Sequence, residues 1–371
     1  MEHSFKEIKK NFGFGCMRLP LIDGKVDDAH FCQMIDTFIE NGFNYFDTAC
    51  MYVDSQSEGA IKRCLTSRYS RDQYILVDKL SSGYFEKEED IEPFLDLQLE
   101  KCGVDYFDFY LMHAQSSRNY SKYQNCNAYN KVLELKEKGK IKHLGISFHD
   151  TADVLDMILT DHPEIEIVQI QFNYLDYEDP EVQSRKCYEV CVKHNKPVIV
   201  MEPVKGGSLA NLPEEGKKVL EDLNNGSVAS YAVRFAASFD NIIMVLSGMS
   251  NMDQMNDNLS FMKAFVPLNE KEFDACKEVV EIIYKVNAIQ CTGCRYCVDV
   301  CPKKIVIPEI FNIVNRKRIA KDWHAQTKYN NLTLTSAKAS ECIRCGKCEN
   351  ICPQKLNIRE LLADISKEFD K

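Results

Sequence analysis

Short apolar runs alternate with amphipathic stretches along most of the chain, from about residue 12 to about residue 262. Apolar runs bounded by turn residues are typical of buried β-strands, and apolar residues spaced three or four apart are typical of helices. The strands that this pattern predicts lie at residues 11–19, 43–46, 74–77, 107–112, 141–147, 165–173, 197–201 and 242–247. A helical stretch follows each of them, and such alternation indicates a parallel sheet.

Eight strand–helix units in about 250 residues have the size of a closed barrel, so we predict an α/β fold, a (β/α)8 TIM barrel over residues 1–265. A doubly wound open sheet is the alternative. That fold places a Gly-x-Gly-x-x-Gly fingerprint between its first strand and first helix. Here Gly13-Phe14-Gly15 lies within the first expected strand, and the third glycine is missing.

Three successive apolar runs each end in an ionisable residue: Asp47, Lys79 and His113. Tyr52 follows Asp47 in the next loop. The carboxyl ends of the strands share one face of a TIM barrel, and catalytic residues come from the ends of several strands. We therefore expect these four side chains to meet.

These residue types suit carbonyl reduction by hydride transfer, which requires a proton donor at the developing alkoxide. The Tyr52 hydroxyl can donate if the Lys79 ammonium lowers its pKa, and Asp47 can hold that lysine by an ion pair. His113 can orient the carbonyl or help to relay the proton. Each residue also has a structural alternative. Asp47 and Lys79 can form a buried ion pair, Tyr52 can be a loop aromatic, and His113 can be a core histidine.

Composition narrows the classes of function. The sequence has 45% hydrophobic and 27% charged residues, which is ordinary for a globular protein. A net charge of −10 argues against a nucleic-acid partner, which usually requires a basic face. No apolar stretch approaches the roughly 20 residues of a membrane helix, and the N-terminus lacks the apolar core of a signal peptide. We expect a cytoplasmic protein that binds no membrane.

Seventeen cysteines are many for such a protein, and eight of them form two runs near the C-terminus. Each run has the spacing Cys-x2-Cys-x2-Cys-x3-Cys-Pro, the pattern of bacterial two-cluster ferredoxins, in which the fourth cysteine binds the other cluster. We therefore assign one 4Fe–4S cluster to Cys291, Cys294, Cys297 and Cys352. The second is assigned to Cys342, Cys345, Cys348 and Cys301. Two structural zinc sites are the alternative, but zinc sites usually pair two-cysteine knuckles across a longer loop.

The region around these runs, residues 289–371, resembles the bacterial-type ferredoxin domain, with an insertion at residues 307–335 between the runs. A charged amphipathic stretch within residues 266–288 is expected to be a linker helix.

Residues 12–262 resemble the aldo-keto reductases. Five segments carry this resemblance: Phe46-Asp47-Thr48-Ala49-x-x-Tyr52, Asp78-Lys79, the stretch from Asp105 to His113, Gly145-Ile146-Ser147, and Gly248-x-Ser250 followed by Asn258. The resemblance implies that Asp47, Tyr52, Lys79 and His113 form the catalytic tetrad and that a nicotinamide cofactor binds along the carboxyl face. The cofactor-binding residues that it implies are Ser147, Gln169, Met201, Gly206, Gly248, Ser250, Gln254 and Asn258.

Departures from the family pattern leave the choice between NADPH and NADH open. Met249 and Gln254 stand where members commonly have cations for a 2′-phosphate, and a phosphate without such a partner loses charge-assisted hydrogen bonds. Met201 stands where many members stack an aromatic ring. A barrel of this kind joined to a ferredoxin-like domain resembles an iron–sulfur subgroup of the family.

Three functions follow from the two regions together. The first is a carbonyl reductase whose two 4Fe–4S clusters exchange electrons with an outside ferredoxin or flavoprotein. In the second, the clusters of an ordinary NAD(P)H-dependent reductase serve structure alone. The third is a nucleotide-binding redox sensor without reductase activity, for which the proton donor would have no use.

Overall fold

The computed structural model describes residues 5–286, 288–320, 322 and 324–370. Packing divides the chain into two compact units, each continuous in space but not in sequence. Unit 1 consists of residues 1–203 and 233–268, and unit 2 of residues 204–232 and 269–371. The outermost residues of the predicted barrel and ferredoxin-like regions, and one residue of the predicted linker, lie outside the described residues.

Unit 1 contains the predicted closed barrel, in the strand order β1-β10-β9-β8-β7-β6-β5-β4 with parallel pairing throughout. The TIM-barrel prediction is therefore confirmed. The barrel strands are β1 (Phe12–Gly15), β4 (Tyr45–Asp47), β5 (Ile75–Leu80), β6 (Phe107–Gln115), β7 (Ile141–Phe148), β8 (Ile167–Gln171), β9 (Val198–Met201) and β10 (Ile242–Ser247).

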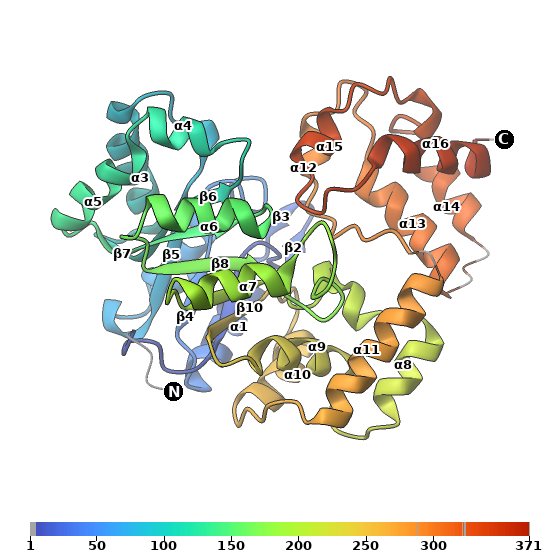
Figure 1. Cartoon of the computed structure of the whole chain (residues 1–371), viewed down its shortest axis with the longest axis horizontal. Helices are drawn as coiled ribbons and strands as arrows, with labels where there is room; N and C mark the ends of the chain where they lie inside the picture. The colour runs from blue at the N-terminus through green and yellow to red at the C-terminus, as the bar shows by residue number, and fades with distance from the viewer. Residues whose placement is uncertain (1–4, 287, 321, 323, 371) are drawn as a thin grey trace. The chain divides into compact units, whose positions relative to one another are not determined.

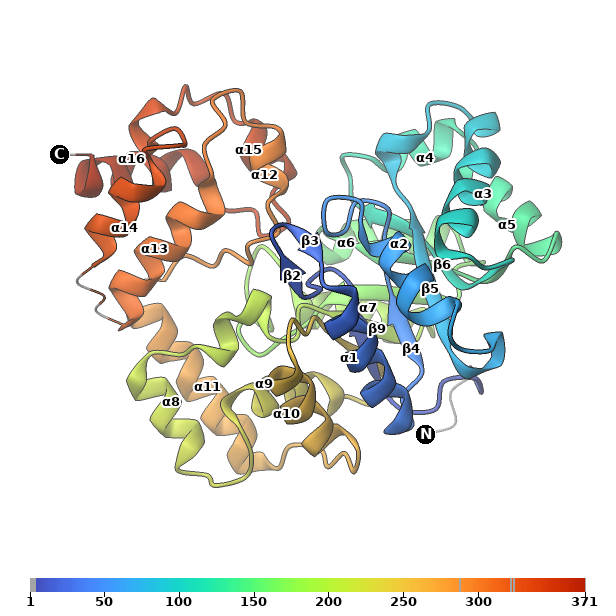
Figure 2. The same ribbon diagram turned by 180° about the vertical axis from the view of Figure 1, so that it is seen from behind.

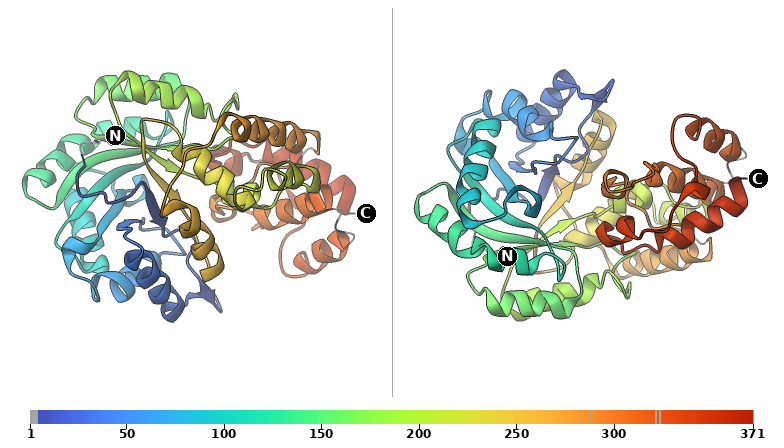
Figure 3. Two further views of the ribbon diagram at one scale, coloured as in Figure 1. Left: turned by 90° about the horizontal axis from the view of Figure 1, so that it is seen from below. Right: turned by 90° about the horizontal axis from the view of Figure 1, so that it is seen from above.

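Helices surround these strands, as the front and back views show (Figures 1 and 2) and as the views from below and above repeat (Figure 3). The helices are α1 (Asp28–Glu40), α2 (Ser57–Ile61), α3 (Ile91–Cys102), α4 (Tyr120–Asn125), α5 (Ala128–Glu137), α6 (Ala152–Asp161), α7 (Ser184–Lys193) and α10 (Met252–Met262). Helix α9 (Val228–Ala237) has residues in both units.

Local sequence explains the ends of these elements. The Asp27 side chain accepts a hydrogen bond from the His30 amide and so caps α1. Gly103 ends α3 in the left-handed conformation that glycine adopts most readily, at φ 69°. Inside the barrel, a side chain at Gly145 would come within 2.5 Å of Leu111 Cδ2 and 2.7 Å of Ile167 Cγ2. The close packing of β6, β7 and β8 therefore requires glycine there.

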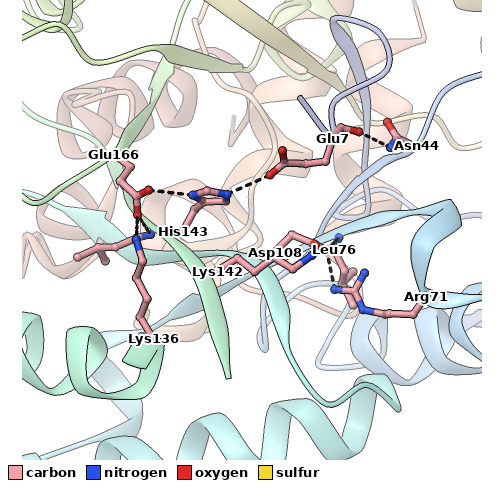
Figure 4. A network of polar contacts seen from close by, with 10 residues as sticks. Glu7, Asn44, Arg71, Leu76, Asp108, Lys136, Lys142, His143 and Glu166 are labelled. Carbon is pink, nitrogen blue, oxygen red and sulfur yellow. Dashed lines mark hydrogen bonds and ion pairs between the residues drawn. The ribbon is translucent and has the colours of Figure 1, made fainter. Parts of the chain in front are cut away.

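The N-terminal segment closes the amino end of the barrel. Phe5 and Ile8 are buried in the cluster of apolar side chains that fills the barrel, and the Phe5 ring packs edge-on against Phe109. His143 lies between two carboxylates, with Nε2 3.0 Å from Glu7 and Nδ1 2.8 Å from Glu166 (Figure 4). This end of the barrel is thus held by charges as well as by apolar packing.

Two details of unit 1 differ from the sequence prediction. The first predicted strand ends early, at Gly15, and a two-residue hairpin follows, with β2 (Leu21–Ile22) paired to β3 (Lys25–Val26). Strands β5 and β6 run longer than predicted, so Lys79 and His113 lie within strands and not just beyond them. The pairing of Lys79 with Leu111 shows that the ladder continues through this region.

Unit 2 is helical among its described residues. It contains a 3-10 segment at Lys205–Ala210 and the helices α8 (Glu214–Glu221), α11 (Glu270–Lys285), α12 (Tyr296–Asp299), α13 (Ile307–Ala320), α14 (Ala325–Leu332), α15 (Lys347–Ile351) and α16 (Ile358–Phe369). The insertion between the cysteine runs therefore forms α13 and α14. Phe311, Val314, Tyr329, Leu362 and Phe369 lie in one apolar core.

The predicted linker helix is α11, and it packs as part of unit 2. Its buried residues include Cys276, Val279 and Ile282, and a side chain on Gly216 of α8 would meet the last two. The division at residues 265 and 288 describes the sequence pattern, whereas packing groups α8 with α11 and the C-terminal helices. No helix in the described part of the chain has the length and hydropathy to cross a membrane.

Candidate active site and cysteine cavities

Asp47 and Lys79 form a buried ion pair at the carboxyl ends of β4 and β5. The Lys79 Nζ lies 2.7 Å from Asp47 Oδ1 and 2.6 Å from the Thr48 carbonyl oxygen. Lys79 is 0% exposed and Asp47 3% exposed. Gln169 on β8 donates to the other Asp47 oxygen at 3.1 Å. The carboxylate therefore has a partner on each side.

Tyr52 approaches this pair from the loop after β4. The Lys79 Nζ lies 4.8 Å from the centre of the Tyr52 ring, and the Tyr52 and His113 rings meet edge to face at 6.2 Å. The four predicted catalytic residues are thus adjacent. Burial, and then the negative charge of Asp47, raise the pKa of Tyr52 well above its ordinary value.

His113 is neutral at neutral pH. Burial, followed by the charges of Lys79 and His149, lowers the pKa of His113 well below its usual value. Its Nδ1 lies 2.5 Å from the Ser81 hydroxyl. The Tyr123 hydroxyl donates to the His113 carbonyl oxygen at 3.0 Å and also lies 2.7 Å from the Leu80 carbonyl oxygen, which ties β6 to β5.

Four of the predicted cofactor residues lie on β7, β8 and β9 or directly after β10. Ser147 is buried on β7, and its hydroxyl oxygen accepts a hydrogen bond from the Ala114 amide at 2.8 Å. Gln169 lies beside Asp47, Met201 is the last residue of β9, and Gly248 directly follows β10. These residues come from successive strands and share the carboxyl face with the tetrad.

Three more predicted cofactor residues lie in α10 and the loop before it. The Ser250 hydroxyl donates to the Arg18 carbonyl oxygen at 2.8 Å, and its amide donates to the Gln254 side chain at 2.7 Å. The Asn258 side chain donates to the Ser247 hydroxyl at 2.9 Å and is buried. The loop after β10 is therefore held firmly to the barrel.

Gly206 belongs to unit 2, whereas the other predicted cofactor residues belong to unit 1. Its φ is 64°, and a side chain there would come within 2.3 Å of the Thr292 carbonyl oxygen, beside the cysteine run. The neighbouring Lys205 donates to the Gln354 side chain at 2.8 Å, and both residues are buried. This loop thus packs against both cysteine runs.

The eight clustered cysteines line two cavities, four in each. One has Cys291, Cys294, Cys297 and Cys352 in its wall, and the other has Cys301, Cys342, Cys345 and Cys348. In each cavity three cysteines come from one run and the fourth from the other. This is the grouping that the ferredoxin spacing implies.

The donor chemistry of both cavities fits an iron–sulfur cluster. Among the described residues, no group of three or more His, Cys, Asp or Glu side chains closes on a single metal ion. Four thiols around an apolar space leave room for a cubane, which is larger than one ion. Burial, followed by the neighbouring cysteines, raises the pKa of the Cys297 thiol above its usual value. Loss of its proton would therefore accompany cluster binding.

Sequence reasoning missed the polar residues behind the tetrad. Gln98 on α3 donates to Asp78 at 3.0 Å and to Glu58 at 3.3 Å, and all three are fully buried. Burial, followed by the charge of Glu58, raises the pKa of Asp78 well above its usual value. Ser81 was also missed. Its position two residues after Lys79 is a signal, since such residues point to the same side of a strand.

Comparison with known families agrees with this geometry. Residues 11–281 match the model of the aldo/keto reductase family, and residues 290–357 match the model of a 4Fe-4S dicluster domain. An uncharacterized oxidoreductase of Bacillus subtilis is 22% identical over 268 residues, which cover 67% of this chain and 89% of the relative. An aldo-keto reductase of Mycolicibacterium vanbaalenii is 24% identical over 241 residues, which cover 64% of this chain and 79% of the relative.

Solved structures give the same fold. An aldo-keto reductase from Klebsiella pneumoniae in complex with NADPH superposes with a TM-score of 0.59 at 17% identity, covering 73% of this chain and 90% of that one. The holo form of an aldo-keto reductase from Bacillus halodurans superposes with a TM-score of 0.59 at 22% identity, covering 72% and 91%.

Proposed function

Because the chain belongs to the aldo/keto reductase family, we propose that it reduces aldehyde or ketone carbonyls with a nicotinamide cofactor. The observation that carries this proposal is the contact of the buried Asp47–Lys79 pair with Tyr52 and His113 at the carboxyl face of the barrel. A buried ion pair alone is weak evidence of function. A phenol and a neutral imidazole beside that pair form a donor set for a developing alkoxide.

Tyr52 is the proposed proton donor. The cofactor, when bound, supplies a hydride to the carbonyl carbon, and the carbonyl oxygen then needs one proton. The raised pKa of Tyr52 keeps its hydroxyl protonated at neutral pH, so the proton is available. As the alkoxide takes it, the Lys79 ammonium stabilises the phenolate that remains. Asp47 keeps that ammonium in place through the 2.7 Å contact.

His113 has the proposed role of orienting the carbonyl. A neutral imidazole can donate one hydrogen bond without giving up a full proton. Ser147 and Gln169 are proposed to hold the carboxamide of the cofactor, since both are polar, buried and on neighbouring strands. Met201 would pack on the nicotinamide ring. Gly206, Gly248, Ser250, Gln254 and Asn258 would line the pyrophosphate and adenosine parts.

The cofactor is NADPH or NADH. The similarity to an NADPH complex of known structure supports a nicotinamide, while Met249 and Gln254 give no cation for a 2′-phosphate. Titration of the purified protein with NADPH and with NADH, followed by quenching of protein fluorescence, decides between them. Equal affinities would mean that the site does not recognise the 2′-phosphate.

The C-terminal cysteines are proposed to hold two 4Fe–4S clusters, grouped as their cavities group them. A cluster passes one electron at a time, whereas a nicotinamide passes two as a hydride. We therefore propose that the clusters exchange electrons with a separate carrier, a ferredoxin or a flavoprotein. The proposed location is the cytoplasm, where thiols remain reduced.

A panel of aldehydes and ketones with anaerobically purified protein tests the reductase proposal. Tyr52→Phe should lose at least about 100-fold in kcat, the scale of general acid catalysis. Tyr45→Phe is the matched control, because the Tyr45 hydroxyl is buried in the same barrel without a hydrogen-bond partner. Equal turnover of wild type and Tyr52→Phe would refute the role of Tyr52.

The alternative is a nucleotide-binding redox sensor or electron-transfer protein whose clusters are structural and which reduces no carbonyl. Electron paramagnetic resonance after addition of NADH or a reduced carrier separates these functions. Clusters that take up electrons from the carrier support the proposal. If the EPR signal of the clusters does not change while reductase activity is full, the clusters have a structural role only.

A further inference from the structure

Behind His113 lies a short chain of hydroxyl and thiol groups that the proposed proton transfer does not use. The Ser81 Oγ is 2.5 Å from His113 Nδ1, and the Cys50 Sγ donates to Ser81 Oγ at 3.5 Å. Ser81, Cys50 and His113 are 2%, 1% and 6% exposed. This contact is therefore shielded from water, which would otherwise compete for Nδ1.

The direction of these hydrogen bonds follows from the Cys50 thiol. Burial raises the pKa of Cys50 to about 11, so the sulfur keeps its proton at neutral pH. With S–H donating to Ser81 Oγ, the Ser81 hydroxyl has its own hydrogen left to donate. His113 Nδ1 lies 2.5 Å away and accepts that hydrogen in the Nε2–H tautomer. A nitrogen that accepts carries no hydrogen, so the single hydrogen of the neutral imidazole is on Nε2.

The other side of the ring faces the tetrad. Within the described residues, His113 Nε2 makes no hydrogen bond and is not among the fully buried polar atoms without a partner. The His113 ring meets Tyr52 edge to face. The imidazole thus has Ser81 at Nδ1 and the Tyr52 ring as a neighbour within the tetrad.

We propose that Ser81 is a positioning residue that holds His113 as the Nε2–H tautomer, so that Nε2 donates to the substrate carbonyl oxygen. The tautomer assignment rests on the Ser81 contact at Nδ1, whereas its use rests on the proposed reductase function. In the other tautomer, Nε2 would present a lone pair to the carbonyl oxygen, and the two would repel. A hydrogen bond at one imidazole nitrogen commonly decides the role of the other.

Nitrogen NMR tests the tautomer without requiring any turnover. Protein labelled with ¹⁵N-histidine is examined by long-range ¹H–¹⁵N correlation, with the His113 signals assigned from their absence in His113→Gln. The wild type should show a protonated Nε2 and an unprotonated Nδ1. Ser81→Ala should shift both signals towards a mixture of tautomers, and Ser81→Thr, which retains a hydroxyl, should restore the wild-type pattern.

Ser57→Ala is the matched control. Ser57 is a buried serine of the same unit, but its hydroxyl donates to the Cys16 carbonyl oxygen at 2.9 Å and not to a histidine. The His113 signals of this variant should match those of the wild type. A protonated Nδ1 in the wild type overturns the proposal, and so does a His113 spectrum that Ser81→Ala leaves unchanged.

Kinetics then test the use of the tautomer. Ser81→Ala should lose about tenfold in kcat/KM, the scale of one hydrogen bond, and Ser81→Thr should recover most of it. Full kcat/KM in Ser81→Ala beside a changed NMR spectrum overturns the positioning role. A wild type that shows the Nε2–H tautomer but reduces no carbonyl would instead refute the proposed function and leave the tautomer assignment standing.

Discussion

Replacing Lys79 by methionine should destabilise the barrel strongly, because it leaves the Asp47 carboxylate buried without its counter-charge. In the wild type, Lys79 Nζ lies 2.7 Å from Asp47 and 2.6 Å from the Thr48 carbonyl oxygen, and both charged residues are buried. Removing one partner of a buried pair typically costs about 3–5 kcal/mol. Asp47 retains the hydrogen bond from Gln169, so we expect the free energy of unfolding to fall by about 3 kcal/mol, the lower end of that range.

The double variant Asp47→Asn/Lys79→Met separates the charge from the packing. An asparagine side chain has nearly the shape of the aspartate that it replaces and can still accept from Gln169, while no buried charge remains. Replacement of a whole buried ion pair by neutral groups is often close to neutral for stability. If each single variant costs about 3 kcal/mol, independent sites would give a double variant that is about 6 kcal/mol less stable. We expect a loss below about 2 kcal/mol, and so a coupling of at least about 4 kcal/mol.

Hydrogen exchange during urea titration measures the free energy of unfolding of the barrel in each variant. The peptide that covers Ile75–Leu80 reports the opening of strand β5, which carries Lys79. A double variant that loses the sum of the two single losses would refute the coupling. The double variant should also lack reductase activity, since neither Asp47 nor Lys79 remains to support the Tyr52 phenolate.

Three further predictions concern pH and iron. Although burial opposes it, hydrogen bonds from His143 and Lys136 lower the pKa of Glu166 to about 2. The ionised Glu166 therefore contributes its full stabilisation above its unfolded pKa of about 4.3, and this stabilisation is lost as the pH falls towards 2. The urea midpoint of the wild type should fall over this range, and that of His143→Gln should fall by a smaller amount. Burial, followed by the charge of Glu58, raises the pKa of Asp78, so its contribution to stability is full below its unfolded pKa of about 3.9 and is lost as the pH rises above that value; urea midpoints of Asp78→Asn should therefore gain on those of the wild type as the pH rises from about 4. Cys352→Ala should lower iron from about eight to about four per chain, and Cys291→Ala/Cys352→Ala should lose no more, since both cysteines line one cavity.

The sequence predicted the barrel well because each strand is buried by its own apolar residues. The runs that end in Asp47, Lys79 and His113 are strands β4, β5 and β6, in that order around the barrel. Helix α10 follows the last predicted strand, as expected, and it begins at Met252 because Asn251 caps its first turn. Such signals depend on residues that are close together in the sequence, so they can be recognised before the fold is known.

The parts that were missed depend on contacts between distant residues. Ser81 and His113 are 32 positions apart, and Gln98 joins two acids from other elements. The β2–β3 hairpin is too short for a periodic pattern. Residues 204–232 join unit 2 because α8 buries one face against α11, which no local pattern announces.

The protonation states, too, could be assigned only from the folded chain, and they bear on the direction of the reaction. The sequence indicates only that Lys79 is a cation that could lower the pKa of Tyr52. In the structure, burial and Asp47 raise the pKa of Tyr52, and burial and Lys79 lower that of His113. Both groups therefore hold a hydrogen and lack a full charge at neutral pH. Reduction needs donors at the carbonyl oxygen, whereas alcohol oxidation needs a base there. For the proposed reductase, we therefore expect carbonyl reduction to be faster than alcohol oxidation near neutral pH, with Lys79 as the cation of the tetrad that stabilises the developing negative charge.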